Sequence, residues 1–164
     1  MSDTASNGNG NGSANGNADI EQAFVLQQIY IKDLSFEAPN SPEIFQEQQV
    51  EPETELNIRN EHQPLKNNNF EVVLNVSIHA KLGDKTIFLL ELQQAGIFLI
   101  NGFAPEQTAI LLGTQCPATL FPYARETIST QVGKGGFPPL VLQPINFESL
   151  YAQAQAQNQQ GLQS

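Results

Sequence analysis

The residues most often used in catalysis are few and scattered in this sequence. His62 and His79 lie far apart, and the single cysteine, Cys116, precedes a proline with no obvious base beside it. No Cys/His spacing indicates a zinc site, and a thiol without a base is more typical of a buried structural cysteine than of a nucleophile. We therefore predict a protein that is not an enzyme and that has no metal and no cofactor.

A glycine-rich run could in principle bind phosphate. Gly133-Lys134-Gly135-Gly136 lacks the Ser or Thr after the lysine and the strand–loop–helix context that a phosphate loop needs. Its glycines suit the left-handed cap that ends a helix. We interpret the run as a helix terminus.

Carboxylates are plentiful, and the formal net charge is −10. Glutamates crowd residues 43–61, with Asp33 and Glu37 just before them, and only Lys32 and Arg59 offset that region. An acidic surface repels nucleic acid and anionic lipid and favours basic partners, although solubility alone is the simpler and favoured explanation of such a charge. We expect no nucleic-acid partner.

The cellular setting follows from what the sequence contains. A single cysteine fits a reducing compartment. No apolar run approaches the ~20 residues of a membrane span, and residues 1–18, which are rich in Asn and Gly, do not read as a secretory signal. We expect a cytoplasmic protein without direct membrane insertion.

The stretch from Phe70 to Ile100 organises the elements that would position any site. Its first half alternates apolar and polar residues up to Leu82, which predicts a strand with one buried face. Gly83-Asp84 supplies a tight turn. The return strand is apolar on both faces, so we expect a partner subunit to cover its second side.

Two further strands precede this hairpin. Residues 23–37 are rich in β-branched and aromatic residues and predict a strand on which Ile29, Ile31, Asp33 and Glu37 share one face. Prolines end it, and a polar loop follows with isolated apolar residues. Residues 54–59 predict a short amphipathic strand, and residues 60–69 a turn-rich connection. The sequence thus predicts four strands.

Helices are expected after Gly102. Pro105 opens a short helix that Gly113 closes, and residues 117–132 form a longer one with an apolar stripe. Asn146 caps a last amphipathic helix. We expect residues 1–18 to be a disordered tail, residues 19–154 to form one domain, and residues 155–164 to be a flexible Gln-rich tail.

Apolar residues also occur where surface is expected. Val50 lies in the polar loop, and Phe137, Leu140 and Val141 lie in a proline-stiffened loop before the last helix. They could form the wall of a groove for an extended apolar chain. Packing of the same residues onto the sheet is the equally weighted alternative.

Four segments resemble the SecB family of bacterial export chaperones. They are IYIKDLSFEAPNSPEIF (29–45), LQQAGIF (92–98), LFPYARETI (120–128) and GGFPPLVLQPINFESLY (135–151). They occur in the family's order, and the resemblance spans residues 23–152. It implies an α+β fold, a four-stranded antiparallel sheet with helices packed on one side, and a homotetramer built as a dimer of dimers.

The resemblance also implies an activity. Members hold unfolded precursor proteins in a translocation-competent state and deliver them to the SecA translocation ATPase in the bacterial cytoplasm. An apolar groove can bind many unfolded chains, because each buried large side chain contributes about 1.5–3 kcal/mol without a cofactor and weak contacts add up through multivalency.

The family's functional residues carry over by position. The acidic surface that docks SecA would fall on Asp33, Glu37, Leu82 and Asp84, with Lys85 as a departure from the family pattern. Residues that would line the client groove are Val50, Leu56, Ile58, Phe137, Leu140, Phe147, Leu150 and Tyr151. Many relatives have Trp where this chain has Val50.

Two alternatives remain open at the level of sequence. A SecB-like chaperone of a toxin–antitoxin system would protect an antitoxin instead of a precursor, but the acidic docking residues favour the export form. A small hot-dog-like thioesterase would need a long buried helix wrapped by the sheet and a positioned carboxylate or histidine. Neither feature is visible in the sequence.

Overall fold

The computed structural model describes residues 20–47 and 51–162. Val50 and the N-terminal tail therefore lie outside the described residues. The elements are β1 (Ala23–Glu37), the 3-10 helix η1 (Glu43–Gln46), β2 (Glu53–Pro64), β3 (Asn69–Leu82), β4 (Lys85–Asn101), α1 (Pro105–Gly113), α2 (Gln115–Lys134) and α3 (Phe147–Gly161).

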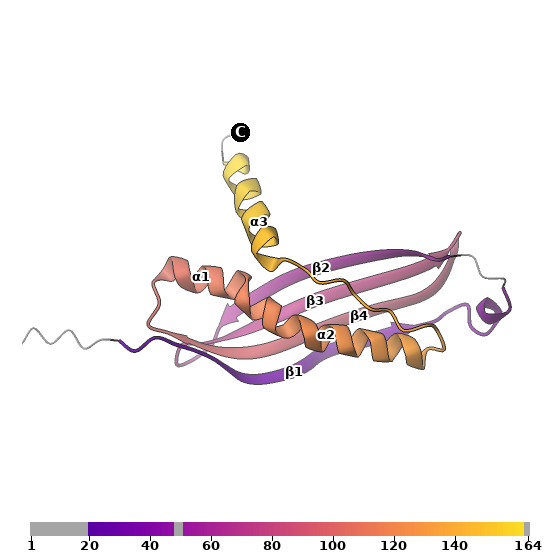
Figure 1. Ribbon diagram of the computed structural model, residues 1–164, viewed down its shortest axis with the longest axis horizontal. Coiled ribbons are helices and arrows are strands. Elements are labelled where there is room, and N and C mark those ends of the chain that lie inside the picture. Colours follow the sequence, from indigo (N-terminus) through magenta and orange to yellow (C-terminus); the bar gives the residue numbers. More distant parts are fainter. Residues whose placement is uncertain (1–19, 48–50, 163–164) are drawn as a thin grey trace, which may run out of the picture.

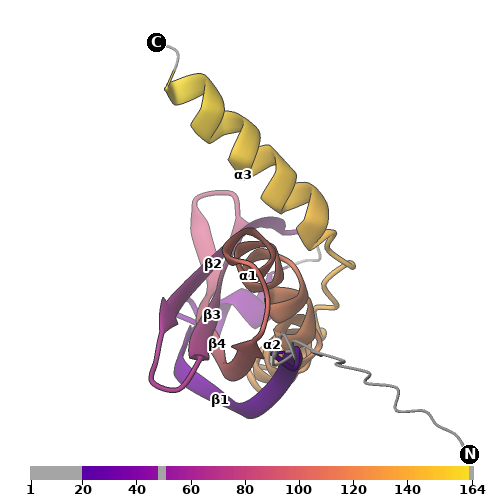
Figure 2. The same ribbon diagram turned by 90° about the vertical axis from the view of Figure 1, so that its left-hand side faces the viewer.

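The predicted hairpin is the centre of the sheet. The strands pair in the order β1-β4-β3-β2, all antiparallel, so β3 and β4 are the inner strands. Gly83, with φ of 58°, makes the turn between them, a conformation that glycine adopts without steric cost. Figures 1 and 2 show α1 and α2 along one face of the sheet. This arrangement confirms the expected α+β fold.

A β-bulge in β1 corrects one sequence expectation. The register with β4 shifts between Ile31 and Asp33, so Lys32 is an extra residue. The bulge reverses the alternation, and Ile31 therefore faces the helices while Asp33 faces the opposite side. The prediction that Ile29 and Ile31 share a face with Asp33 was wrong, whereas Asp33 and Glu37 do share one.

The second strand is longer than predicted. β2 continues to Pro64, through residues that we expected to form a turn-rich connection. As an edge strand β2 is largely exposed, so it tolerates polar residues along its length and a proline at its end. Between β1 and β2, the expected polar loop contains η1, whose Ile44 is buried.

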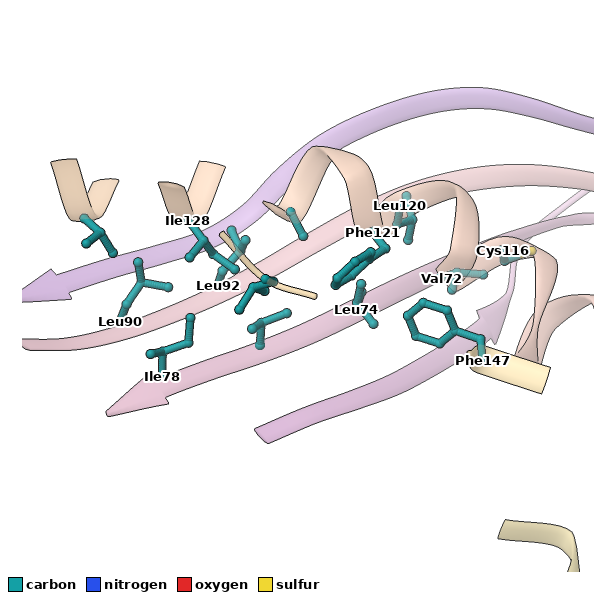
Figure 3. Close-up of a cluster of buried hydrophobic side chains, with 14 of the residues drawn as sticks. Val72, Leu74, Ile78, Leu90, Leu92, Cys116, Leu120, Phe121, Ile128 and Phe147 are labelled. Carbon is teal, nitrogen blue, oxygen red and sulfur yellow. The ribbon is translucent and has the colours of Figure 1, made fainter. Parts of the chain in front are cut away.

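The core lies between the helices and the inner strands. The predicted stripe of α2 is buried, with Leu120, Ala124 and Ile128 fully covered. These side chains meet Leu74 and Leu92 from β3 and β4 (Figure 3). Pro122 lies inside α2 and is accommodated on its exposed side.

The opposite face of the sheet, which we call the open face, has no second layer among residues 20–47 and 51–162 (Figure 2). Leu89, Ile97 and Leu99 on this face remain partly exposed, whereas Ala95 and Val73 are buried. The described part of the chain does not supply the covering layer that the sequence predicts for β4. At the other end of the chain, α3 stands away from the body (Figure 1) and reaches Gly161, through residues expected to form a flexible tail.

Candidate functional site

Four phenylalanines from separate segments form one aromatic stack. Phe36 lies 5.7 Å from Phe88, Phe88 lies 5.5 Å from Phe137, and Phe137 lies 5.3 Å from Phe45, all between ring centroids. These distances are typical of favourable aromatic pairs. Gly135 permits the stack, because a Cβ there would overlap the Phe36 ring.

Sequence reasoning found only Phe137 of this stack. Phe36, Phe45 and Phe88 come from β1, η1 and β4, and no periodicity within one segment shows that the fold brings them together. Phe45 gave the one available signal, because it is an apolar residue in a polar segment. Its side chain is 51% exposed, so the stack ends at the surface.

The other predicted groove residues differ in exposure. Ile58 and Leu140 are partly buried against the core, whereas Leu56 and Leu150 are 46% and 44% exposed. Val141 is 66% exposed. The proline-rich loop and β2 therefore each carry both kinds of apolar side chain: one that packs against the core and one that is exposed to solvent.

The base of α3 is attached to the helical layer by two aromatic rings. Phe147 is only 6% exposed and contacts Phe121 edge to face at 5.9 Å. Tyr151 lies against Gly113, where a Cβ would overlap its ring. In this conformation Phe147 therefore lies beneath the surface on which its predicted role as a groove residue would place it.

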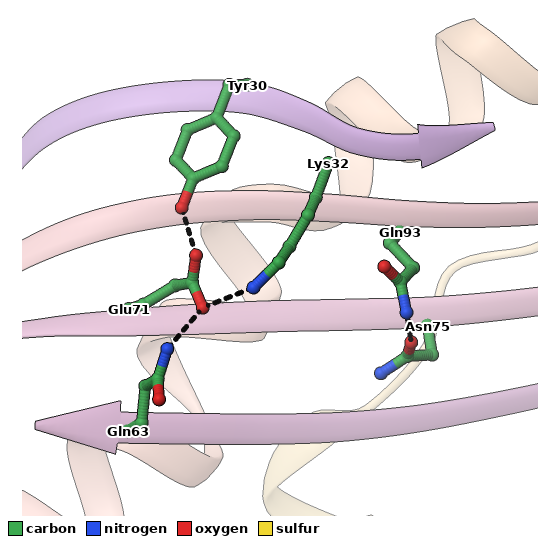
Figure 4. Close-up of polar contacts among 6 residues, drawn as sticks. All are labelled: Tyr30, Lys32, Gln63, Glu71, Asn75 and Gln93. Atoms are coloured by element: carbon green, nitrogen blue, oxygen red, sulfur yellow. Dashed lines mark hydrogen bonds and ion pairs between the residues drawn. The ribbon is translucent and has the colours of Figure 1, made fainter.

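The open face carries the predicted acidic residues. Asp33, opposite Gln93, lines a hollow that crosses the sheet through Asn75 to Arg59. Within it, Gln93 donates a hydrogen bond to Asn75, with 3.0 Å between the two atoms (Figure 4). Glu37 is on the same face of β1, two positions beyond Ser35. At ~3.3 Å per residue of strand, the backbone positions of the two residues are about 13 Å apart.

Basic side chains of the open face are paired with glutamates. The pairs are Lys32–Glu71 at 2.8 Å, Arg59–Glu61 at 3.1 Å and Lys81–Glu55 at 3.7 Å. Asp33 and Glu37 have no ion pair within residues 20–47 and 51–162. Asp33 and Glu37 therefore carry unneutralised negative charge on β1, and Glu91 of β4 and Glu53 of β2 add two further unpaired carboxylates to the same face.

The hairpin turn carries Leu82 and Asp84. The next residue, Lys85, forms an ion pair with Glu47 at the end of η1. In the same region the Asn40 side chain donates to the Thr86 carbonyl at 2.8 Å. The positive charge of Lys85, unexpected beside an acidic docking surface, is therefore matched by a carboxylate from the neighbouring segment.

Glu71 is the centre of a polar network on the open face. Its carboxylate accepts hydrogen bonds from Lys32 at 2.8 Å, Gln63 at 2.9 Å and the Tyr30 hydroxyl (Figure 4). The Lys32 hydrogen bond, followed by that from Tyr30, lowers the pKa of Glu71. Desolvation and the bond to Glu71 raise the pKa of Tyr30 to about 12.

Sites of other kinds are not visible in the part of the chain that the structure describes. No cluster of three or more His, Cys, Asp or Glu there is arranged to hold a metal ion. Cys116 is buried, and desolvation raises the pKa of its thiol to about 12, which suppresses the reactive thiolate. Among the described helices, none is both long and apolar enough to span a membrane.

The open-faced sheet and the exposed apolar loop define a SecB-like fold. A SecB-like chaperone of Mycobacterium tuberculosis, solved in complex with a peptide from an antitoxin, superposes with a TM-score of 0.61 over 75% of this chain and 91% of that one, at 17% identity. At that identity the likeness concerns the fold alone.

Sequence comparison identifies the family itself. The sequence model of the SecB family, described as preprotein translocase subunit SecB, matches residues 17–158 of this chain. The protein-export protein SecB of Nitrosococcus oceani is 56% identical over 83% of this chain and 84% of its own length. That of Stenotrophomonas maltophilia is 47% identical over 98% of this chain and 91% of its own. The chain belongs to the SecB family of protein-export chaperones.

Proposed function

We propose that this protein binds unfolded precursor proteins on its exposed apolar surface and delivers them to the SecA translocation ATPase. The observation that carries the proposal is the exposure of three large apolar side chains, Phe45, Leu56 and Val141, each of which is about half exposed or more. The relatives at 47–56% identity, which are named as export proteins, favour this function over antitoxin protection or catalysis.

The apolar surface fits an unfolded client. An unfolded chain presents scattered apolar and aromatic side chains, and the stack that ends at Phe45 offers rings without fixed hydrogen-bond demands. Leu56 on the edge strand β2 adds apolar area beside backbone groups that can pair with an extended chain. Such contacts need neither a nucleotide nor a cofactor.

The open face fits a basic partner surface. Asp33 and Glu37 lie in a row on β1 without ion pairs among the described residues. Charges of this kind speed up association and fix the orientation of a complementary surface. We assign to them, with Leu82 and Asp84 at the hairpin, the docking of SecA in the bacterial cytoplasm.

Assembly into a homotetramer, a dimer of dimers, completes the proposal. β1 is an edge strand with unpaired backbone groups. On the helical layer, Ile110 and Tyr123 are 47% and 49% exposed and offer apolar area to another copy. Several copies would let a long client contact several apolar surfaces at once.

The client-binding part is tested by the refolding of a chemically denatured precursor. We expect the purified protein, without nucleotide, to slow refolding in proportion to its concentration. Leu56→Ser together with Val141→Ser should weaken this effect by about tenfold, because two exposed apolar contacts are lost. Refolding at the same rate with and without the wild-type protein would refute the proposal.

The docking part is tested by SecA binding. We expect Asp33→Ala with Glu37→Ala to raise the Kd for SecA by about tenfold through a slower association rate. The control, Glu106→Ala with Glu148→Ala, removes the same charge from exposed residues of α1 and α3, which are away from the open face and have no ion pair among the described residues. If both double variants bind SecA like the wild type, the assignment of the docking surface is wrong.

A further inference from the structure

Glu71 is a carboxylate on the open face that the proposed function does not use. It lies on the inner strand β3 and is only 8% exposed. Its Oε1 accepts from Lys32 Nζ at 2.8 Å and from Gln63 Nε2 at 2.9 Å, and its Oε2 accepts from the Tyr30 hydroxyl (Figure 4). Donors from β1 and β2 thus hold one carboxylate from both sides.

Stability alone is a weak reason for this arrangement. The Glu71 carboxylate loses hydration on folding, and its ion pair with a lysine that is 44% exposed adds little stability in return. The inner strands of this sheet already bury large apolar residues on the helix side, such as Leu74 and Leu92.

The β-bulge of β1 places a lysine next to a docking residue. Lys32 is the extra residue in the register between Ile31 and Asp33, and both Lys32 and Asp33 project to the open face. A lysine with 44% of its side chain exposed is otherwise free to turn toward the adjacent carboxylate. The positive charge of Lys32 in that position would neutralise the negative charge of Asp33.

We infer that Glu71 is a positioning residue for the docking surface: it binds the ammonium group of Lys32 over β3 and so keeps the carboxylate of Asp33 available to a basic partner. The inference rests on the docking role proposed above for Asp33 and Glu37. Tyr30 and Gln63 fix the Glu71 carboxylate in the orientation that receives the lysine. Asp33 itself has no ion pair among the described residues.

The first test measures the affinity of the full-length protein for purified SecA. Glu71→Gln leaves Lys32 with an uncompensated charge beside Asp33. We expect the Kd to rise about three- to tenfold at physiological salt, as the Coulomb interaction of adjacent exposed charges allows, and the difference to shrink at high salt. Glu53→Gln, which removes one charge from the same face without releasing a lysine, should change the Kd less than twofold.

Removal of the lysine should rescue binding. In the double variant Lys32→Gln/Glu71→Gln the pair is neutral, and we expect a Kd within about twofold of the wild type. A purely structural role for Glu71 predicts the opposite, since the double variant lacks the same carboxylate. Persistent loss of SecA binding in the double variant would therefore overturn the inference.

Glu71→Asp provides a variant that keeps the charge. Its shorter side chain cannot reach all three donors, so Lys32 is released in part although the net charge is unchanged, and we expect the Kd to rise at least about twofold. If thermal unfolding shows that Glu71→Gln does not fold, the Kd of Glu71→Asp tests the positioning role of Glu71 in its place. Wild-type affinity of the folded Glu71 variants would overturn the inference alone, whereas absence of SecA binding by the wild-type protein would refute the docking proposal itself.

Discussion

At the scale of single residues, ion pairing divides the acidic side chains of the open face into two groups. Glu55, Glu61 and Glu71 each neutralise a base, whereas Asp33, Glu37, Glu53 and Glu91 have no ion pair among the described residues. A count of charges along the sequence gives only the net value of −10. Which carboxylates remain unpaired, and so can attract a basic partner, depends on the side-chain contacts that the folded sheet makes.

The Glu71 network should make stability depend on pH at both extremes. The lowered pKa of Glu71 stabilises the folded state above its ordinary value of 4.5, and this contribution is lost as the pH falls through the lowered value. Because the pKa of Tyr30 is raised, its neutral hydroxyl stabilises the folded state fully below pH 10.0. This stabilisation is lost as the pH rises through about 12. Chemical denaturation at neutral pH should show Glu71→Gln to be about 1–3 kcal/mol less stable than the wild type.

The same measurement across pH checks the sign of each contribution. The difference between the wild type and Glu71→Gln should decrease below pH 4.5, and the difference between the wild type and Tyr30→Phe should decrease above pH 10. A difference that stays constant or grows at both extremes would contradict the assigned contacts.

At the scale of elements, the end of α2 is built to receive the aromatic stack. Gly135 follows α2, and the chain then turns through Gly136, whose φ is 87°, into the loop that carries Phe137. The Phe36 ring lies where a Cβ of Gly135 would be. The glycine run that superficially resembles a phosphate loop therefore serves packing.

Two glycine substitutions separate packing from helix propensity. Gly135→Ala should destabilise the protein by about 1–3 kcal/mol, because the new methyl group displaces the Phe36 ring from the stack. Gly133→Ala, whose Cβ would lie 3.8 Å from Pro139, should instead stabilise α2 by about 0.4–1 kcal/mol. Thermal unfolding of both variants tests this, and equal effects on the unfolding temperature would contradict the packing argument.

Element boundaries were largely predictable from the sequence, whereas two features of geometry were not. The bounds of β1 and α1 follow from composition and from proline and glycine signals. The bulge at Lys32 does not, since it depends on pairing with β4, and it reverses the face of Ile31. The predicted site residues were found through motifs of the family, but the stack of Phe36, Phe45 and Phe88 required the fold to bring three segments together.

At the scale of the whole molecule, the fold leaves edge strands and one sheet face available for contacts with other molecules. Both β1 and β2 are edge strands, and one face of the sheet has no covering layer within residues 20–47 and 51–162. On the other side, α3 stands away from the body (Figure 1). The proposed assembly, client and docking partner would use different parts of this surface.

The assembly has a direct test in solution mass. We expect a particle of about four times the chain mass of 17.9 kDa by light scattering. Tyr123→Lys places a charge at a half-exposed aromatic position of the helical layer and should reduce that mass at low protein concentration. The exposed Gln153→Lys on α3 is a matched control that should leave it unchanged. A wild-type mass of one chain would contradict the tetramer.

The central claim, that unfolded chains bind on the exposed apolar surface, is tested most directly by hydrogen exchange with and without a denatured precursor. Edge strands and loops exchange readily in a free protein, so bound client should protect their amides. We predict protection in η1, in β2 around Leu56 and in the loop at residues 137–145, with the amides of β1, the strand that carries Asp33 and Glu37, unchanged. Protection confined to β1, or none while the precursor is bound, would contradict the account.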